Sequence, residues 1–402
     1  MAISGSHYEP YGWEHWPDEP WFSYQFRRAL GEAGVGGGTV SESFLAASRM
    51  NPVDRESWYR EWRRVADASR ERAQTAERHR YFVTARDCFL RAANQYRSAE
   101  FWLDPADPRR LETFGRCEDS FRSAGRYFRP PVEHVEIPYL GDKVLYAHLL
   151  KSPKAGAPQP LLIAVGGLDS FKEEMLFMVG KAALDRGIAC LFVDGPGQGA
   201  TLRREGLTTR FDYEVPIAAC IDWLSSRPDV DQARIALSGS SLGGYYAARA
   251  ASFEHRLAAA VSHGGQWDLG QQWANRDENH GLAMHIKWVF GTQTMAAARE
   301  KASAFRLAGA IEGMTCPYLI VHGGHDVLGV AQATTLYDYA KAHGVDVTLR
   351  VVDAQETGAE HCQHDNPTVG MEIIADWLCD RFGIDQAAAL GALRASEQRR
   401  AG

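Results

Sequence analysis

Hydrophobic and polar positions follow a helical rhythm in the first third of the chain. The stretches 53–78 and 81–102 contain no Gly or Pro, and in the second of them apolar residues recur every three or four positions. This pattern predicts helices over about 53–78, 81–102 and 107–127, with Asn51-Pro52 as the cap and first position of the first helix. Residues 1–50 show no clear rhythm, and Gly36-Gly37-Gly38 indicates a loop.

From about residue 132 the pattern changes to short apolar runs that alternate with helical stretches. Two strand-like runs come first, and helices lie between most of the later ones from residue 171 onward. This order predicts a mostly parallel eight-stranded sheet with helices on both faces, preceded by an N-terminal helical cap. The expected parts are 1–130 for the cap, 131–385 for the sheet domain and 386–402 for a tail. The predicted strands are 133–139, 144–150, 160–165, 189–194, 234–237, 258–262, 318–321 and 347–352.

Residues 264–306 interrupt the alternation with a long polar and aromatic stretch that contains Trp267, Trp273, Trp288 and Phe290. An insertion after the sixth strand would lie above the carboxyl ends of the strands, where such sheets bind ligands. We therefore expect Trp267, Asp268 and Trp273 to line a substrate pocket, together with Tyr81 of the cap.

Composition and charge narrow the range of partners. The chain has 402 residues and a formal net charge of −7, which argues against nucleic acid as a partner. The seven cysteines are scattered, odd in number and never in a Cys-x-x-Cys pair, which favours a reducing compartment and indicates no zinc site. The N-terminus resembles no signal peptide, and no apolar run has membrane length. We expect a cytoplasmic protein with no metal, no cofactor and no membrane partner.

The strongest chemical signal is Gly239-Ser240-Ser241-Leu242-Gly243, between the strand 234–237 and a helical stretch. Gly-x-Ser-x-Gly at a strand-to-helix turn is typical of a nucleophile elbow, where small residues permit the sharp turn. Ser241 would be the nucleophile, and the N–H of Leu242 would face a developing oxyanion. A Gly- and Ser-rich loop that matches by chance is the alternative.

The other parts of a hydrolase follow the same strand order. Gly167 and Leu168, after the third strand, are candidates for the second oxyanion-hole N–H. Asp326 follows the seventh strand and is the expected acid, with Asp268 as a competitor. The base should lie in the loop after the last strand, where both His361 and His364 qualify.

Several motifs together resemble one branch of the α/β-hydrolases. They are Gly166–Ser170 followed by Lys172-Glu173-Glu174, then Asp194–Gly199, Gly239–Gly244 and Glu360–Cys362. This branch contains 2,6-dihydroxypseudooxynicotine hydrolase, a carbon–carbon bond hydrolase of nicotine breakdown, and fungal hydrolases that shorten polyketide chains. The resemblance spans about residues 50–385, the N-terminal helices included.

The resemblance implies an α/β-hydrolase fold, a Ser241–Asp326–His361 triad and a homodimer. It favours His361 over His364, because the histidine of the branch directly precedes a cysteine. The nicotine-pathway enzyme uses an additional glutamate after the sixth strand, whereas the stretch 267–273 contains Asp268 and no glutamate.

These observations predict a cofactor-independent serine hydrolase that acts on a small molecule. The expected reaction is cleavage of a carbon–carbon bond next to a ketone, in an aryl-ketone or polyketide-like substrate. A hydrolase of esters, thioesters or lactones, or an acyltransferase, could use the same triad. The remaining alternative is a catalytically silent binding protein, because a fold alone does not define a function.

Overall fold

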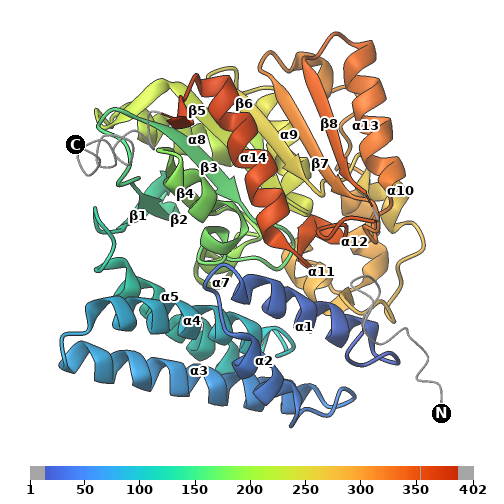
Figure 1. Ribbon diagram of the computed structural model, residues 1–402. Coiled ribbons are helices and arrows are strands. Elements are labelled where there is room, and N and C mark those ends of the chain that lie inside the picture. The colour runs from blue at the N-terminus through green and yellow to red at the C-terminus, as the bar shows by residue number, and fades with distance from the viewer. Residues whose placement is uncertain (1–13, 354, 388–402) are drawn as a thin grey trace, which may run out of the picture.

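A computed structural model describes residues 14–353 and 355–387 (Figure 1). Its centre is an eight-stranded sheet in the order β1-β2-β4-β3-β5-β6-β7-β8. Strand β2 is antiparallel to both β1 and β4, and all other neighbours are parallel. The strands are β1 (Glu133–Tyr139), β2 (Lys143–Leu150), β3 (Gln159–Val165), β4 (Ala189–Asp194), β5 (Val230–Ser240), β6 (Ala259–His263), β7 (Tyr318–Gly323) and β8 (Val347–Val352).

Both faces of the sheet are covered, as the near-continuous apolar runs of its inner strands require. Along β3, Leu161 and Ile163 belong to one apolar core and Leu162 belongs to the other. The first core includes α8 (Glu214–Ser225), α9 (Leu242–Ala251) and α13 (Val330–Ala342). The second includes η2 (Leu176–Gly180), α6 (Lys181–Asp185) and α14 (Pro367–Phe382). The predicted sheet and its two helical layers are thus confirmed.

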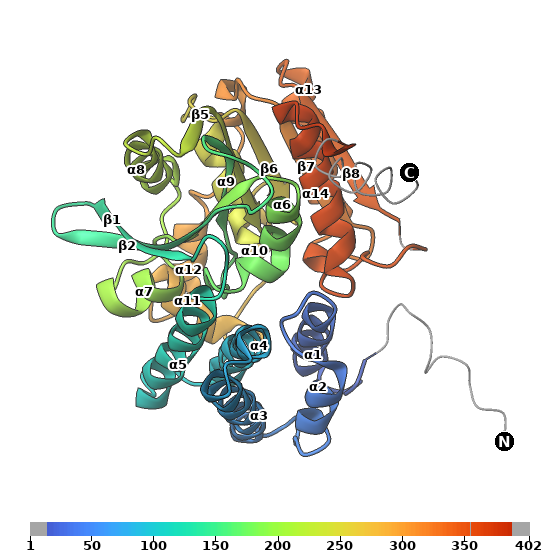
Figure 2. The same ribbon diagram turned by 60° about the vertical axis from the view of Figure 1, so that its left-hand side comes forward.

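Five helices precede the sheet and lie side by side below it in Figures 1 and 2. Three of them lie where the apolar rhythm predicts helices. The cap of α3 is Asp54 rather than Asn51, because the Asp54 carboxylate accepts a hydrogen bond from the N–H of Glu56 at 3.0 Å. The five are α1 (Pro20–Ala33), α2 (Val40–Ala47), α3 (Arg55–Arg78), α4 (Phe82–Glu100) and α5 (Pro108–Gly125).

Helices α1 and α2 correct the interpretation of residues 1–50 as a stretch without rhythm. Pro20 occupies the first turn of α1, and Phe22, Phe26 and Ala29 recur on one buried face. Phe22 packs on Trp58 of α3, with 5.2 Å between the ring centroids. The apolar face of α1 is therefore buried against the longer helices.

The helical layer shares an apolar core with the rest of the chain. Phe114 of α5 packs edge-on against Phe171, with 5.1 Å between the ring centroids. The same cluster continues through Phe121 into Leu162 of β3. The helical layer thus rests directly on the elements that follow the sheet strands, and the division of the chain at residue 130 stays a prediction.

The remaining elements lie in the connections. Residues 264–306, between β6 and β7, form three short helices. None of the helices in the described ranges is long and apolar enough to cross a membrane. The predicted tail lies, from residue 388 onward, outside the described residues. The connecting elements are α7 (Gly199–Glu205), α10 (Leu269–Trp273), α11 (Ala283–Phe290), α12 (Met295–Ala302), η3 (Ile311–Gly313) and η4 (His361–Gln363).

Candidate active site

Ser241 is the single residue of a strained turn between β5 and α9. Its φ of 58° is positive, which is uncommon for a residue with a side chain. A Cβ on Gly239 would lie 1.8 Å from the carbonyl oxygen of Gly243, so only glycine fits there. The N–H of Ser241 donates to the carbonyl of His263, at 2.7 Å, which ties the turn to the end of β6. This is the geometry of a nucleophile elbow.

Three side chains from different connections meet at this turn. His361 Nε2 lies 2.9 Å from Ser241 Oγ. His361 Nδ1 lies 2.9 and 2.8 Å from the two carboxylate oxygens of Asp326. The structure thus brings together the serine, histidine and aspartate that the sequence predicts, in the order of a Ser–His–Asp relay.

The two ionisable members of this group shift each other's pKa values. Burial by itself would lower the pKa of His361, but the Asp326 carboxylate raises it well above its usual range. Burial would likewise raise the pKa of Asp326, yet the charge and hydrogen bond of His361 lower it. The N–H of Leu328 also donates to Asp326, at 2.8 Å. The Asp326 carboxylate is therefore placed to stabilise an imidazolium when His361 accepts a proton.

Neither alternative member reaches Ser241. The ring of His364 packs edge-on against Tyr24, with 5.9 Å between the centroids, and burial lowers its pKa well below the usual range. Asp268 caps α10 by accepting a hydrogen bond from the N–H of Gln271 at 2.9 Å. His361 and Asp326 are thus the histidine and the carboxylate that meet the serine.

Two backbone N–H groups are free to bind a substrate oxygen beside Ser241. Leu242 opens α9, so its N–H is among the unpaired donors of a helix start. Gln198 donates to the Gly167 carbonyl at 3.2 Å, and the N–H of Leu168 points the opposite way in the same trans peptide. Within the described ranges, neither N–H donates to a protein acceptor.

Gly167 itself lies against the elbow. A Cβ added at Gly167 would lie 2.8 Å from Cβ of Ser241, so a larger residue would push the two loops apart. The structure therefore places Gly167, Leu168 and Leu242 where the sequence predicts an oxyanion hole.

A cavity of about 290 Å³ opens beside Ser241. Its walls come from α1, from the segment 264–306 and from the loops after the strands. Helix α1 runs along the lower edge of the sheet in both ribbon views. Helix α1 therefore forms the roof of the cavity, on the side that faces away from the sheet, and none of the described lining residues comes from the longer helices α3 to α5. Lining residues include Tyr24, Arg28, Met178, Trp273, Arg276 and Leu282.

Of the four predicted pocket residues, only Trp273 lines this cavity. Trp267 packs against Tyr339 instead, with 4.8 Å between the ring centroids, and Asp268 caps a helix. Tyr81 is 64% exposed at the turn between α3 and α4. The pocket assignments of these three residues are corrected, because Tyr81 faces solvent, the Trp267 ring packs on α13 and the Asp268 carboxylate caps a helix.

Residues 169–174, which follow Leu168, form ion pairs with the helical layer. Arg28 of α1 lies 2.8 Å from Asp169 and 2.7 Å from Glu174. Lys172 lies 2.8 Å from Glu118 of α5 and 3.0 Å from Asp194. The role of these residues is thus to join the cap helices to the loop that carries Leu168. Sequence reasoning missed Arg28 and Tyr24, although Pro20 at a helix start was a usable signal.

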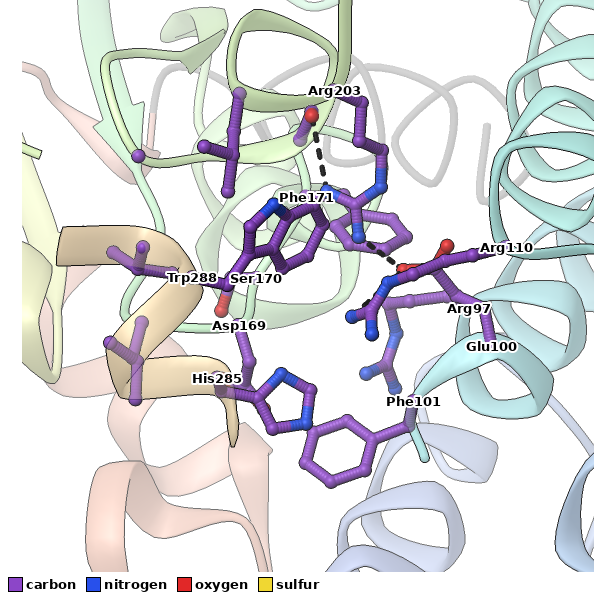
Figure 3. Close-up of a pocket in the computed structure, with 15 residues that line it drawn as sticks. Arg97, Glu100, Phe101, Arg110, Asp169, Ser170, Phe171, Arg203, His285 and Trp288 are labelled. Atoms are coloured by element: carbon purple, nitrogen blue, oxygen red, sulfur yellow. Dashed lines mark hydrogen bonds and ion pairs between the residues drawn. The ribbon is translucent and has the colours of Figure 1, made fainter. Parts of the chain in front are cut away.

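A second, much smaller pocket lies on the seam between the helical layer and α11 (Figure 3). Arg110 and Arg203 point toward Trp288, at 4.3 and 4.8 Å from the ring centroid. Burial lowers the pKa of Arg110 to about 10 and that of His285 to about 3. With a volume of about 10 Å³, the pocket holds about one water molecule and is too small for a substrate.

Two family models each match more than half of the chain. Residues 53–269 match the family described as "Esterase FrsA-like", and residues 171–384 match the prolyl oligopeptidase family. Among curated relatives, 20-hydroxy-prefusarin hydrolase FUS2 of Gibberella moniliformis is 32% identical over 74% of this chain and 81% of its own. Hydrolase ORFZ of Pyricularia oryzae is 32% identical over 76% and 82%.

Solved structures agree with these matches. The crystal structure of 2,6-dihydroxy-pseudo-oxynicotine hydrolase has a TM-score of 0.75 and 28% identity, and the match covers 87% of this chain and 95% of that one. AbyA5 has a TM-score of 0.68 at 20% identity, over 93% and 99% of the two chains, which supports the fold alone. The chain therefore belongs to the FrsA-like esterase family, in the α/β-hydrolase branch of 2,6-dihydroxypseudooxynicotine hydrolase and the fungal hydrolases, and it is a hydrolase.

Proposed function

We propose that the protein is a serine hydrolase that forms an acyl-enzyme on Ser241 and cleaves a carbon–carbon bond next to a ketone. The observation that supports serine chemistry is the position of His361, hydrogen-bonded at one nitrogen to Ser241 and at the other to Asp326. A nucleophile, a base and an orienting carboxylate are the three parts that such a reaction needs.

In the first step, Ser241 Oγ attacks the substrate carbonyl while His361 Nε2 accepts its proton across 2.9 Å. The carbonyl oxygen becomes an anion that the N–H groups of Leu242 and of Leu168 or Gly167 stabilise. Asp326 stabilises the imidazolium that forms, which matches the raised pKa of His361.

In the second step, the carbonyl re-forms and the bond to the leaving carbon breaks, with its electron pair going to that carbon. His361 returns the proton to the leaving carbon, or to its enol oxygen, and Ser241 keeps the acyl group as an ester. Water then attacks this ester while His361 takes its proton, the bond from the acyl carbon to Ser241 Oγ breaks, and His361 returns the proton to Oγ as a carboxylic acid leaves. No further reactant is required.

Carbon is a poor leaving group, so the substrate must delocalise the charge of the departing carbon. A 1,3-dicarbonyl or a phenol-like ring next to the ketone meets this requirement. The similarity to 2,6-dihydroxy-pseudo-oxynicotine hydrolase supports this class of substrate, as do the aromatic walls that Trp21, Tyr24 and Trp273 give the cavity.

Hydrolysis of an ester, thioester or lactone is the second candidate. The description of the matching family as an esterase favours it. The same three side chains would cleave an ester more readily, because an alkoxide leaves more easily than a carbanion.

The test compares kcat/KM for 1-phenyl-1,3-butanedione with kcat/KM for ethyl benzoate, at equal enzyme concentration. Release of benzoic or acetic acid from the diketone, abolished in Ser241→Ala, supports carbon–carbon cleavage. Acid from the ester alone, with none from this or other β-diketones, moves the assignment to the esterase. No turnover of either, together with no labelling of Ser241 by a fluorophosphonate, would indicate a binding protein.

A further inference from the structure

Three arginines line the cavity beside Ser241, and two of them are neutralised by neighbouring carboxylates. Arg28 lies 2.8 Å from Asp169 and 2.7 Å from Glu174. Arg27 lies 3.6 Å from Glu360. The third, Arg276, comes from the segment between α10 and α11 and differs from both.

Arg276 has no carboxylate within 4.0 Å anywhere in residues 14–353 and 355–387, although Glu14 lines the same cavity. Its guanidinium lies over the ring of Trp273, with 5.1 Å to the centroid. Burial alone lowers its pKa to about 10. The cation is therefore partly withdrawn from water without an ionic partner.

A half-buried guanidinium without a partner loses hydration that the protein does not replace. The stacking on Trp273 offsets part of this cost and orients the planar group. The stacking leaves the N–H edge of the guanidinium uncovered. This edge is the part that binds carboxylates through two parallel hydrogen bonds. An oxyanion from outside the protein would supply the missing partner.

The backbone that carries Arg276 is firmly held. Its N–H donates to the carbonyl of Trp273 at 2.9 Å, and its own carbonyl accepts a hydrogen bond from Arg299 Nη1 at 2.9 Å. A fixed backbone and a stacked side chain limit the entropy that binding would cost. The position of the Arg276 guanidinium is thus largely fixed before a ligand binds.

We propose that Arg276 selects substrates that carry an anionic oxygen, held by the guanidinium on the cavity wall while the ketone or ester lies at Ser241. The anion is either a carboxylate or the enolate of an acidic 1,3-dicarbonyl, since both present delocalised negative charge on oxygen. This inference rests on the proposed function, because it places the substrate in the cavity of Ser241.

The carboxylate arm of the test uses mono-p-nitrophenyl glutarate and its methyl ester, which differ in one negative charge. In the wild type we expect a higher kcat/KM for the acid. In Arg276→Gln, kcat/KM for the acid should fall about 10- to 100-fold, the range of a lost hydrogen bond to a charged group, and that for the methyl ester should change less than about twofold. Arg276→Lys should lie between, because it keeps the charge and loses the fork.

The enolate arm compares 1-phenyl-1,3-butanedione with its 2,2-dimethyl derivative, which cannot form an enolate, as competitors of neutral ester hydrolysis. Weaker inhibition by the first compound alone in Arg276→Gln identifies the enolate as the ligand. Lys287→Gln is the control for general charge effects, because Lys287 lies in the same segment but pairs with Glu278 at 2.8 Å, outside the cavity lining.

If Arg276→Gln affects charged and neutral compounds equally in both arms, the inference is wrong. If the wild type hydrolyses none of these esters, the proposed function fails instead. Binding of glutarate, measured through the quenching of tryptophan fluorescence, then still tests the role of Arg276. Tighter binding by the wild type than by Arg276→Gln supports the inference, and equal binding refutes it.

Discussion

The buried Arg28 and the partly buried Asp169 form an ion pair, with 2.8 Å between Nη1 and Oδ2. The first belongs to the roof of the active-site cavity, and the second directly follows the oxyanion-hole candidate Leu168. The pair therefore couples the position of helix α1 to the position of the Leu168 N–H, which the proposed reaction would use. The position of this loop thus depends on a helix whose Arg28 lies 141 residues earlier in the sequence.

We expect Arg28→Gln to destabilise the protein by about 3 kcal/mol, because Asp169 loses its cation and the buried Glu174 is left with Arg97, at 3.5 Å. Activity should fall as well, since the loop that carries Leu168 loses its support. Chemical denaturation and kcat measure the two effects. The control is Arg60→Gln: the Arg60 side chain is exposed and its partner Glu61 keeps an ion pair with Arg64, so the loss should be less than about 1 kcal/mol. Equal effects of the two substitutions would contradict this account.

Ser241→Ala should abolish turnover and leave the fold intact, because it removes one oxygen from an otherwise unchanged turn. Loss of a triad member typically costs about 10⁴- to 10⁶-fold in kcat. The matched control is Ser240→Ala: the Ser240 hydroxyl lies 3.5 Å from His263 Nδ1, with no link to His361. We expect a mild effect there, measured with the same substrate and checked by circular dichroism. Near-normal turnover in Ser241→Ala would exclude it as the nucleophile.

His361→Ala should lower kcat as strongly as the serine variant, because among residues 14–353 and 355–387 it is the base that lies within hydrogen-bond distance of Ser241 Oγ. His364→Ala should keep substantial activity, since His364 packs on Tyr24 and only shapes the cavity wall. Single-turnover rates for both variants provide the measurement. The reverse order of severity would move the base to His364.

The pH profile should report His361. The neutral ring is the active form, and Asp326 raises the pKa of His361 well above its usual range, so kcat/KM should rise with pH through an apparent pKa above 6.5. Asp326→Asn removes the carboxylate that favours the cation. The acidic limb should therefore move to lower pH while the maximal rate falls by about 10⁴-fold. An unmoved limb would show that another group titrates.

Stability should depend on Glu32 near neutral pH. Burial raises the pKa of Glu32 to about 7 against the charge of Arg97, and the neighbouring Glu174 carboxylate adds to the shift. A folded-state pKa above the unfolded one stabilises the fold at low pH, and this contribution is lost as pH rises through 7. We expect Tm of the wild type to fall between pH 5 and 8 relative to Tm of Glu32→Gln. Parallel curves for the two proteins would refute this.

The strands and the long helices could be predicted because each depends on a local rhythm of apolar residues. The elbow and the order of its partners could be predicted as well, since strand ends bring Ser241, Asp326 and His361 to one edge of the sheet. Between His361 and His364 the sequence pattern alone did not decide. The structure distinguishes them through the Asp326 hydrogen bonds, which depend on the turn at η4.

The cavity wall could not be predicted, because it depends on how distant segments pack. Tyr81 and Trp267 have the side chains of a substrate wall, yet one is exposed and the other packs on Tyr339. Helix α1 was missed because its aromatic residues lie on more than one side: Phe22 and Phe26 face the helical core, whereas Trp21 and Tyr24 line the cavity. Its apolar side faces other helices, and its charged side faces the loop at Asp169.

The two-sided burial of α1 also sets an order of events during protein synthesis. Its apolar side finds Trp58 and Trp102 soon after it leaves the ribosome. Arg27, on the other side of α1, pairs with Glu360. At a synthesis rate of 5–20 residues per second, Glu360 is made roughly 15 to 70 seconds after Arg27. The helical layer is thus made first, and Arg28 and Glu32 lie on the side that later contacts Glu174. The active site can be completed only after His361, which follows the last strand β8, has been made.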